Sequence, residues 1–287
     1  MKPPPFDYHA PRDLAEALAV LAGVGERGKV LAGGQSLIPL LNMRLAVPEH
    51  LVDINRLAEL DTLSVASDGV TVGALARHSR VERSTQAAAV QPLLRKALRL
   101  VAHPVIRNRG TIVGSLVHAD PAAEMPAALT LLGGSVRLAR DGGEVRDVPA
   151  ADFFTGPLES ALRPGELAVS AFFPALPPRS GTAFHELARR HGDFALAGVA
   201  AAVTLDESGA TTSAKVACIG VGSTPVVLDV TGAEPDEVAH AVRGAIEPDA
   251  DIHASARYRS HLAGVLATRA IDEANGEARR ALDHTGR

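Results

Sequence analysis

The sequence of 287 residues is poor in sulfur-containing and aromatic residues. It has one cysteine, Cys218, no tryptophan, and only 3% aromatic residues. A single cysteine excludes an internal disulfide and an iron–sulfur cluster ligated by cysteines of this chain. Because Cys218 lies in the apolar run 214–221, we expect a buried, unreactive thiol. The core must therefore consist mainly of Ala, Val and Leu.

Several classes of function lack their signatures. The eleven histidines show no His-x-x-x-His spacing, so no metal site is expected. Ser36 and Ser115 lack the Gly-x-Ser-x-Gly context of a hydrolase nucleophile. The net charge of −4 argues against nucleic-acid or membrane-surface partners. No run is long enough for a membrane span and the N-terminus lacks a signal-peptide core, so we expect a cytoplasmic protein.

Apolar periodicity predicts mixed helices and strands in more than one packed unit. A Pro- and Gly-rich linker is expected at 176–181. The expected helices cover 14–22 (capped by Asp13), 81–88, 92–102, 125–132, 235–246 and 255–274. The expected strands cover 29–31, 51–54, 63–66, 69–73 (a hairpin turned at Asp68-Gly69), 135–140, 144–148, 167–173, 197–205 and 214–220.

The first notable stretch is Val-Leu-Ala-Gly-Gly-Gln-Ser at 30–36. A strand end meets Gly33 and Gly34, and a helix is expected to begin with Ser36 as its N-cap and Pro39 in its first turn. Two residues without Cβ let the backbone turn tightly and approach a ligand closely. Free N–H groups at such a helix start attract phosphate oxygens. The alternative is an ordinary tight turn.

A second stretch, 107–126, has the same character. Gly110 and Gly114 are followed by the small hydroxyl residue Ser115, and then by Asp120 and Glu124. Two such loops far apart in sequence suit a long ligand with two phosphates, held between two subdomains. Asp120 and Glu124 could also form an acid–base pair, or play the ordinary roles of a turn residue before proline and a helix cap.

The two stretches together resemble a known family. AGGQSLIPLLNMRLAVPEHLVDINRL and IRNRGTIVGSLVHADPAAEMPAAL are similar to the FAD-binding medium subunit of the molybdenum hydroxylases, which include xanthine dehydrogenase and carbon monoxide dehydrogenase. The resemblance covers nearly the whole chain. It implies an α+β fold with a PCMH-type FAD-binding domain at 1–176, subdivided at about 1–55 and 56–176. A smaller antiparallel-sheet-plus-helix domain at 177–287 would close over the flavin.

The resemblance also implies a set of cofactor-binding residues, but no catalytic or metal-ligating ones. Glu124 stands where the family commonly has a cofactor-bonding Asp, and Val113 stands where it usually has glycine. If that position required a positive φ, the β-branched Val113 would be strained. The expected cofactor-binding residues are Ala32, Gly33, Gly34, Gln35, Ser36, Thr111, Ile112, Val113, Gly114, Ser115, Asp120, Glu124, Leu167 and Phe194.

Phe194 belongs to the stretch 189–195, Arg-Arg-His-Gly-Asp-Phe-Ala. On its own, this stretch is typical of a solvated loop. By resemblance, it matches a segment of the family's C-terminal domain in which an aromatic ring can lie against the flavin.

The function implied is electron transfer within a complex. FAD on this chain would accept electrons from iron–sulfur clusters of a small partner subunit and pass them to an external acceptor. A large partner subunit would carry the molybdopterin cofactor, and the assembly would be a dimer of heterotrimers. Two alternatives stay open. One is a free-standing flavin oxidoreductase of the same broad fold, and the other is a scaffold subunit without flavin, which the departures at Val113 and Glu124 would favour.

Overall fold

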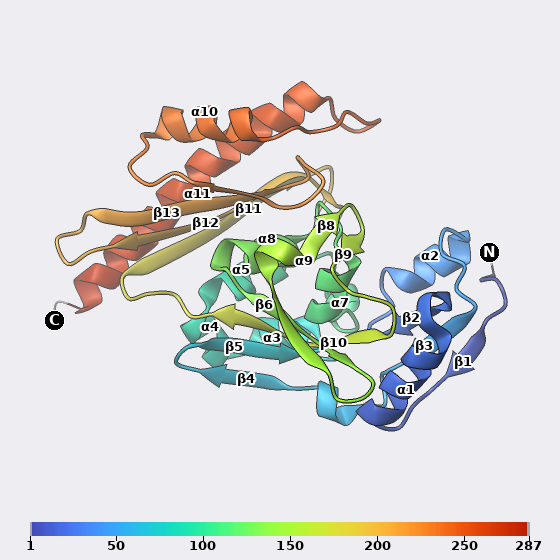
Figure 1. Cartoon of the computed structure of the whole chain (residues 1–287). Helices are drawn as coiled ribbons and strands as arrows, with labels where there is room; N and C mark the ends of the chain where they lie inside the picture. The colour runs from blue at the N-terminus through green and yellow to red at the C-terminus, as the bar shows by residue number, and fades with distance from the viewer. Residues whose placement is uncertain (1, 286–287) are drawn as a thin grey trace.

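The computed structural model describes residues 2–285 and divides their strands among four sheets. Figure 1 shows the blue N-terminal unit on one side of the central five-stranded sheet and the yellow-to-red C-terminal unit on the other. Within residues 2–285, the sheets have three, five, four and two strands. The expected mixed architecture of helices and strands is thus confirmed, with an antiparallel-sheet-plus-helix unit at the C-terminal end.

The N-terminal unit is a parallel sheet of three short strands in the order β1-β3-β2. Helix α1 begins as predicted, because Asp13 Oδ1 accepts a 2.8 Å hydrogen bond from the Glu16 amide and caps the helix. The elements are β1 (Asp7–His9), α1 (Leu14–Val24), a 3-10 turn (Gly25–Arg27), β2 (Gly28–Leu31), α2 (Leu37–Met43) and β3 (His50–Asp53).

The middle unit is an antiparallel sheet in the order β4-β5-β10-β6-β7. The predicted hairpin at Asp68-Gly69 is confirmed by β4 (Leu63–Ala66) pairing with β5 (Gly69–Gly73). The remaining strands are β6 (Ser135–Arg140), β7 (Val145–Pro149) and β10 (Glu166–Pro174), with a small pair β8 (Phe154–Gly156) and β9 (Glu159–Ser160). The helices are a 3-10 turn (Ala58–Leu60), α3 (His78–Arg83), α4 (Thr85–Val90), α5 (Pro92–Leu100), α6 (Pro104–Arg107), α7 (Ile112–His118), α8 (Glu124–Leu132) and α9 (Ala150–Phe153).

The C-terminal unit is an antiparallel sheet in the order β11-β12-β13-β14, packed against two helices. Its bounds are β11 (Ser180–Ala188), β12 (Ala195–Leu205), β13 (Thr211–Ile219), β14 (Val226–Asp229), α10 (Pro235–Ala245) and α11 (Ala256–Thr285). Sequence reasoning missed β11 and β14. Near its start, β11 buries four consecutive residues, so its sequence lacks the alternation of apolar and polar residues that predicts a strand. The strand also begins inside the predicted linker. Helix α11 also extends past the predicted end at 274, because Ala278 is buried in its packing face.

The C-terminal sheet is buried on both faces. Ala200, Ala217 and Ile219 join the core of the N-terminal and middle units, whereas Val199 and Cys218 join a second core under α10 and α11. The predicted core of Ala, Val and Leu is confirmed. Burial raises the pKa of the Cys218 thiol to about 12, so it is an inert core residue, as expected.

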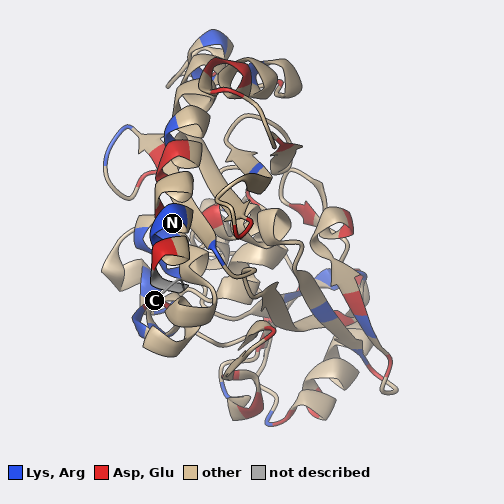
Figure 2. Ribbon diagram, turned by 90° about the vertical axis from the view of Figure 1, so that its left-hand side faces the viewer, with Lys and Arg blue, Asp and Glu red and all other residues tan. Residues whose placement is uncertain are grey.

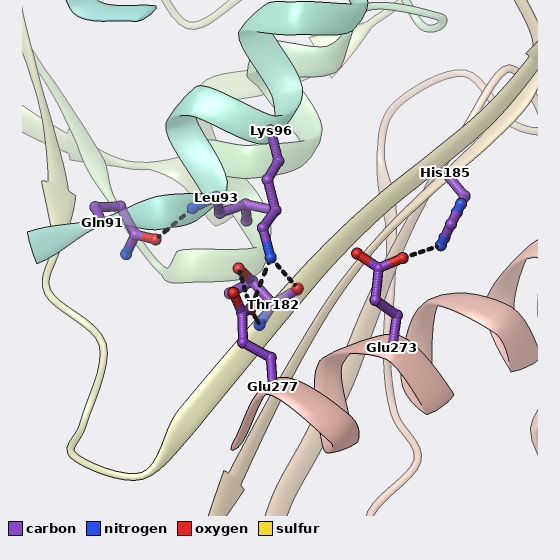
Figure 3. Close-up of polar contacts among 7 residues, drawn as sticks. All are labelled: Gln91, Leu93, Lys96, Thr182, His185, Glu273 and Glu277. Atoms are coloured by element: carbon purple, nitrogen blue, oxygen red, sulfur yellow. Dashed lines mark hydrogen bonds and ion pairs between the residues drawn. The ribbon is translucent and has the colours of Figure 1, made fainter. Parts of the chain in front are cut away.

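A polar contact ties the two domains together at the end of the sheet. Figure 3 shows Lys96 of α5 reaching Glu277 of α11 and the backbone of Thr182 in β11. Lys96 Nζ donates to Glu277 Oε2 at 2.6 Å and to the Thr182 carbonyl oxygen at 2.5 Å. The same carboxylate oxygen accepts from the Thr182 amide at 2.7 Å. This domain clamp (Lys96, Thr182 and Glu277) joins elements of both domains.

Charges of both signs are interspersed over the ribbon in Figure 2. Among the helices of residues 2–285, none combines the length and hydropathy that a bilayer crossing requires.

Candidate functional site

A hollow of about 690 Å³ lies where the N-terminal unit meets the middle unit. This volume falls within the usual range for a small-molecule site. We call it the loop hollow, and we call residues 32–36 the first loop and residues 107–126 the second motif. The lining residues are Leu31, Ala32, Gly33, Gly34, Gln35, Ile38, Pro39, Asp53, Asn55, Arg77, Ile106 and Arg109.

The first loop needs both of its glycines, for different reasons. Gly34 has a φ of 74°, which favours glycine. Gly33 lies so close to the backbone of the second motif that a Cβ would collide with the Arg109 carbonyl oxygen and would lie 2.8 Å from the Gly110 Cα. The close approach at Gly33 is therefore between the two loops themselves.

The first loop presents free hydrogen-bond donors. Across residues 2–285, no hydrogen bond uses the backbone N–H groups of Gly33, Gly34, Gln35 or Ser36. Such a run of amides before a helix suits an anion. The expectation that the Ser36 side chain caps α2 was wrong, because Ser36 has helical φ and ψ and its hydroxyl makes no capping bond. The backbone instead continues the helical turn, with the Gly34 carbonyl accepting from Ile38.

A polar network joins the first loop to the second motif. Asn55 Nδ2 donates to the Ala32 carbonyl oxygen at 2.8 Å, and Asn55 Oδ1 accepts from Arg77 Nη2 at 2.7 Å. Arg77 Nη1 in turn donates to the Arg109 carbonyl oxygen at 2.5 Å. Asp53 accepts from Asn55 Nδ2 at 2.6 Å. These four hydrogen bonds thus form a network that joins the first loop to the second motif.

Asp53 also connects the network to the N-terminal strand. Its Oδ2 accepts a 2.6 Å hydrogen bond from the Tyr8 hydroxyl. Burial opposes ionisation of Asp53, but the hydrogen bonds from Tyr8 and Asn55 outweigh it and hold the pKa of this carboxyl below its ordinary value. Asp53 is therefore a carboxylate at neutral pH, beside the cationic Arg77.

The second motif is a helix rather than a glycine loop over most of its first half. Thr111 caps α7, with Oγ1 accepting from the Gly114 amide at 3.1 Å. Val113 lies inside this helix, is buried and has no positive φ, so the β-branched side chain is unstrained. Ile112 is buried, and Gly114 and Ser115 are partly buried.

His78 packs against the start of the second motif at Gly110. Its backbone amide donates to the Gly110 carbonyl oxygen at 2.9 Å, and a Cβ on Gly110 would lie 3.1 Å from the His78 ring. Burial lowers the pKa of His78 to about 4, so the imidazole is neutral at pH 7. This tight packing accounts for glycine at position 110.

The rest of the second motif leads to the junction with the C-terminal domain. Asp120 Oδ1 accepts from the Ala122 amide in a turn, and the Pro121 carbonyl oxygen accepts from the Gly220 amide at 2.9 Å. Glu124 is the first residue of α8 and not its cap, which is Ala123. Burial, and then the negative charge of Glu186 on β11, raise the pKa of Glu124 to about 8. Burial likewise raises the pKa of Glu186 to about 7.

The two remaining predicted site residues lie apart from the loop hollow. Leu167 is buried in β10, opposite Ala139 of β6. Phe194 is 70% exposed. Its loop nonetheless approaches the entrance to the second motif, because His191 packs edge-on against His103 with ring centroids 5.7 Å apart.

The loop hollow thus brings together four of the predicted residues, Ala32, Gly33, Gly34 and Gln35. Sequence reasoning missed its polar side chains, which are Asp53, Asn55, Arg77 and Arg109. Asp53 lies in a predicted strand and Asn55 follows it directly, which is a usable signal, but Arg77 follows a distant hairpin and has no motif. Within residues 2–285, no group of three or more His, Cys, Asp or Glu side chains is arranged to hold a metal ion.

Comparisons with known proteins agree with this arrangement. Residues 4–176 match the family model of the FAD binding domain in molybdopterin dehydrogenase, and residues 182–274 match that of the CO dehydrogenase flavoprotein C-terminal domain. The chain is 40% identical to the 6-hydroxypseudooxynicotine dehydrogenase complex subunit alpha of Paenarthrobacter nicotinovorans, covering 99% of this chain and 100% of that one. It is 34% identical to the carbon monoxide dehydrogenase medium chain of Afipia carboxidovorans, covering 97% and 100%.

Solved structures of related proteins share the fold of this chain. CO dehydrogenase from Oligotropha carboxidovorans superposes with a TM-score of 0.91 at 34% identity, covering 96% of this chain and 100% of that one. Quinoline 2-oxidoreductase from Pseudomonas putida 86 superposes with a TM-score of 0.88 at 35% identity, covering 98% of this chain and 100% of that one. With both domains and their order matched over almost the whole length, this chain belongs to the family of FAD-binding medium subunits of the molybdenum hydroxylases.

Proposed function

We propose that the chain holds FAD between the first loop and the second motif and works as an electron-transfer subunit. It would accept electrons from iron–sulfur clusters of a small partner subunit and pass them to an external acceptor. The observation that carries this proposal is the meeting of the two loops at Gly33 and Arg109, beside a hollow lined by free backbone amides and two arginines. These groups fit the charge and shape of a dinucleotide diphosphate.

The residues of this chain would bind and orient the cofactor. Amides of the first loop and the charge of Arg109 would neutralise the diphosphate. The second motif leads from Arg109 to the domain junction, where Glu124 offers a carboxyl group and the loop of Phe194 offers an aromatic face. Bound FAD supplies the redox chemistry, and the protein supplies its position and surroundings.

The partners are proposed from the relatives, several of which are named as medium chains or subunits of dehydrogenase complexes. We propose a large subunit with the molybdopterin cofactor, a small iron–sulfur subunit, assembly as a dimer of heterotrimers, and a cytoplasmic location. Sites for the substrate of the complex would then lie outside this chain.

The test is to purify the full chain alone and with co-expressed partners. The proposal predicts a yellow protein whose flavin is released into the supernatant by acid precipitation, because no Cys or His occupies the first loop to form a covalent link. Only the complex should oxidise an organic substrate. A chain without flavin absorption would favour a scaffold subunit, and substrate oxidation by the chain alone would favour a free-standing flavoenzyme.

A further inference from the structure

We propose that Asn55 and Arg77 are positioning residues that fix the spacing between the first loop and the second motif. This spacing lets both loops hold the same dinucleotide at once. The inference rests on the proposed FAD site. It assigns a role to Asn55, near the end of the first resembling stretch, and to Arg77, which lies in neither stretch. The proposed role is to fix the position of the loops, and neither residue is proposed to contact the cofactor.

The first loop and the second motif belong to different units of the fold. The first loop follows β2 of the three-stranded parallel sheet, and Asn55 follows β3 of the same sheet. Arg77 lies just beyond β5 of the five-stranded sheet and pairs through its backbone with Thr111 of the second motif. Each side chain is therefore anchored to one loop through its own unit.

The hydrogen bond between Arg77 Nη2 and Asn55 Oδ1, at 2.7 Å, joins these units. On one side, Asn55 Nδ2 holds the Ala32 carbonyl oxygen at 2.8 Å. On the other side, Arg77 Nη1 holds the Arg109 carbonyl oxygen at 2.5 Å. A continuous path of three hydrogen bonds thus runs from the first loop to the second motif.

The side-chain amide of Asn55 takes part in this path as a donor on one side and as an acceptor on the other. Its Nδ2 group faces three acceptors, which are Asp53 Oδ1 and the carbonyl oxygens of Leu31 and Ala32, so only its Oδ1 can accept from Arg77. An aspartate at position 55 would face the Asp53 carboxylate without a donor. Asn55 is also fixed by its own backbone amide, which donates to Asp53 Oδ1 at 2.9 Å.

Both terminal nitrogens of Arg77 donate hydrogen bonds to oxygen atoms of the protein. Burial and the nearby charge of Arg109 lower the pKa of its guanidinium, so a cation is held here at some cost. Both contacts fix loop positions. A planar guanidinium can make two divergent hydrogen bonds at once, which a lysine ammonium on a flexible stem cannot hold in the same geometry.

A ligand bound at two loops gains affinity from their fixed separation, as in any two-point attachment. FAD joins AMP to FMN through a diphosphate. ADP and FMN each reproduce only one side of this molecule, so neither needs the spacing. Loss of the path should therefore weaken FAD binding far more than the binding of ADP or FMN. This asymmetry distinguishes a positioning residue from a ligand.

The experiment measures the Kd for FAD on the flavin-free full chain, and the inhibition constants of ADP and FMN as competitors. For Arg77→Met we expect the Kd for FAD to rise by about tenfold or more, with both competitor constants within about twofold of the wild type. Asn55→Ala should give a similar pattern. The double variant should lose little more than either single variant, because both break the same path.

Arg80→Met is the matched control. Arg80 lies in α3, whose N-cap is Arg77, and pairs with Asp61 at 2.6 Å, away from the loop hollow. It should leave all three constants unchanged. Arg77→Lys should recover part of the FAD affinity and serves if Arg77→Met fails to fold, with thermal unfolding recorded for every variant.

An ADP or FMN constant that rises as much as the Kd for FAD would make Arg77 a direct ligand and overturn the inference. Unchanged FAD affinity in Arg77→Met and Asn55→Ala would also overturn it, while leaving the FAD site intact. A wild-type chain that does not bind FAD at all would instead refute the proposed function, and the inference with it.

Discussion

Gly33 is packed so closely against the carbonyl group of Arg109 that no side chain fits between them. This contact joins the first loop to the second motif across two sheets. It shows that glycine at this position serves the meeting of two backbones, in addition to any approach of a ligand. Gly34, its neighbour, is required for its positive φ instead.

A first prediction follows for Gly33→Ala. The added Cβ must push the two loops apart, so we expect a loss of about 1–3 kcal/mol in the free energy of unfolding, in the range of overpacking. FAD affinity should fall by more than the stability change alone explains. Fluorescence titration with FAD and urea unfolding measure the two effects.

Gly23→Ala provides the control for that experiment. Gly23 lies inside α1 with no atom within 4 Å of an added Cβ, and it has no positive φ. Alanine should therefore be neutral or stabilising there, by up to about 1 kcal/mol, and should leave FAD binding unchanged. Equal behaviour of the two variants would mean that the loop contact is not required.

A second prediction concerns the domain clamp. Glu277→Ala removes the acceptor shared by Lys96 and Thr182, leaving a partly buried ammonium and a backbone amide without their partner. We expect a loss of about 1–3 kcal/mol in the free energy of unfolding, measured by urea denaturation.

Asp147→Ala is the matched comparison, because it breaks an ion pair with Arg137 in which both side chains are half exposed. Exposed pairs contribute about 1 kcal/mol or less, so this variant should change stability little. Should Glu277→Ala be no more destabilising than Asp147→Ala, the clamp would be a surface contact without energetic weight.

A third prediction concerns pH. The pKa values of Glu124 and Glu186 are raised to about 8 and about 7, first by burial. Between the ordinary carboxyl pKa and these values, the folded chain holds protons that the unfolded chain releases. The free energy of unfolding must therefore fall as pH rises through this window.

Glu186→Gln removes one of these titrations and the charge that faces Glu124. The flavin-free variant should lose less thermal stability than the wild type between pH 5 and pH 8, and it should be the more stable of the two at pH 8. Asp120 and Arg107, the other charged groups acting on Glu124, stay in place. The exposed Glu207→Gln serves as control, and identical pH slopes in wild type and Glu186→Gln would refute the explanation.

The sequence by itself determined the local features. Asp13 caps α1 because a capping side chain and the amide it serves are three residues apart, and the Asp68-Gly69 turn closes its hairpin for a similar reason. The glycines at 33 and 34 and the resemblance carried by both motifs pointed to the family. Cys218 was predicted to be buried from its apolar neighbours alone, and it is.

Only the tertiary structure decided how distant segments meet. Ser36 was expected to cap α2, but its φ and ψ are already helical and its hydroxyl makes no capping bond, whereas Thr111 caps α7 with its side chain. Asn55 and Arg77 are 22 residues apart and follow strands of separate sheets, so no periodicity joins them. Their contact depends on how the two sheets pack, and packing is set by burial summed over many residues rather than by any short pattern.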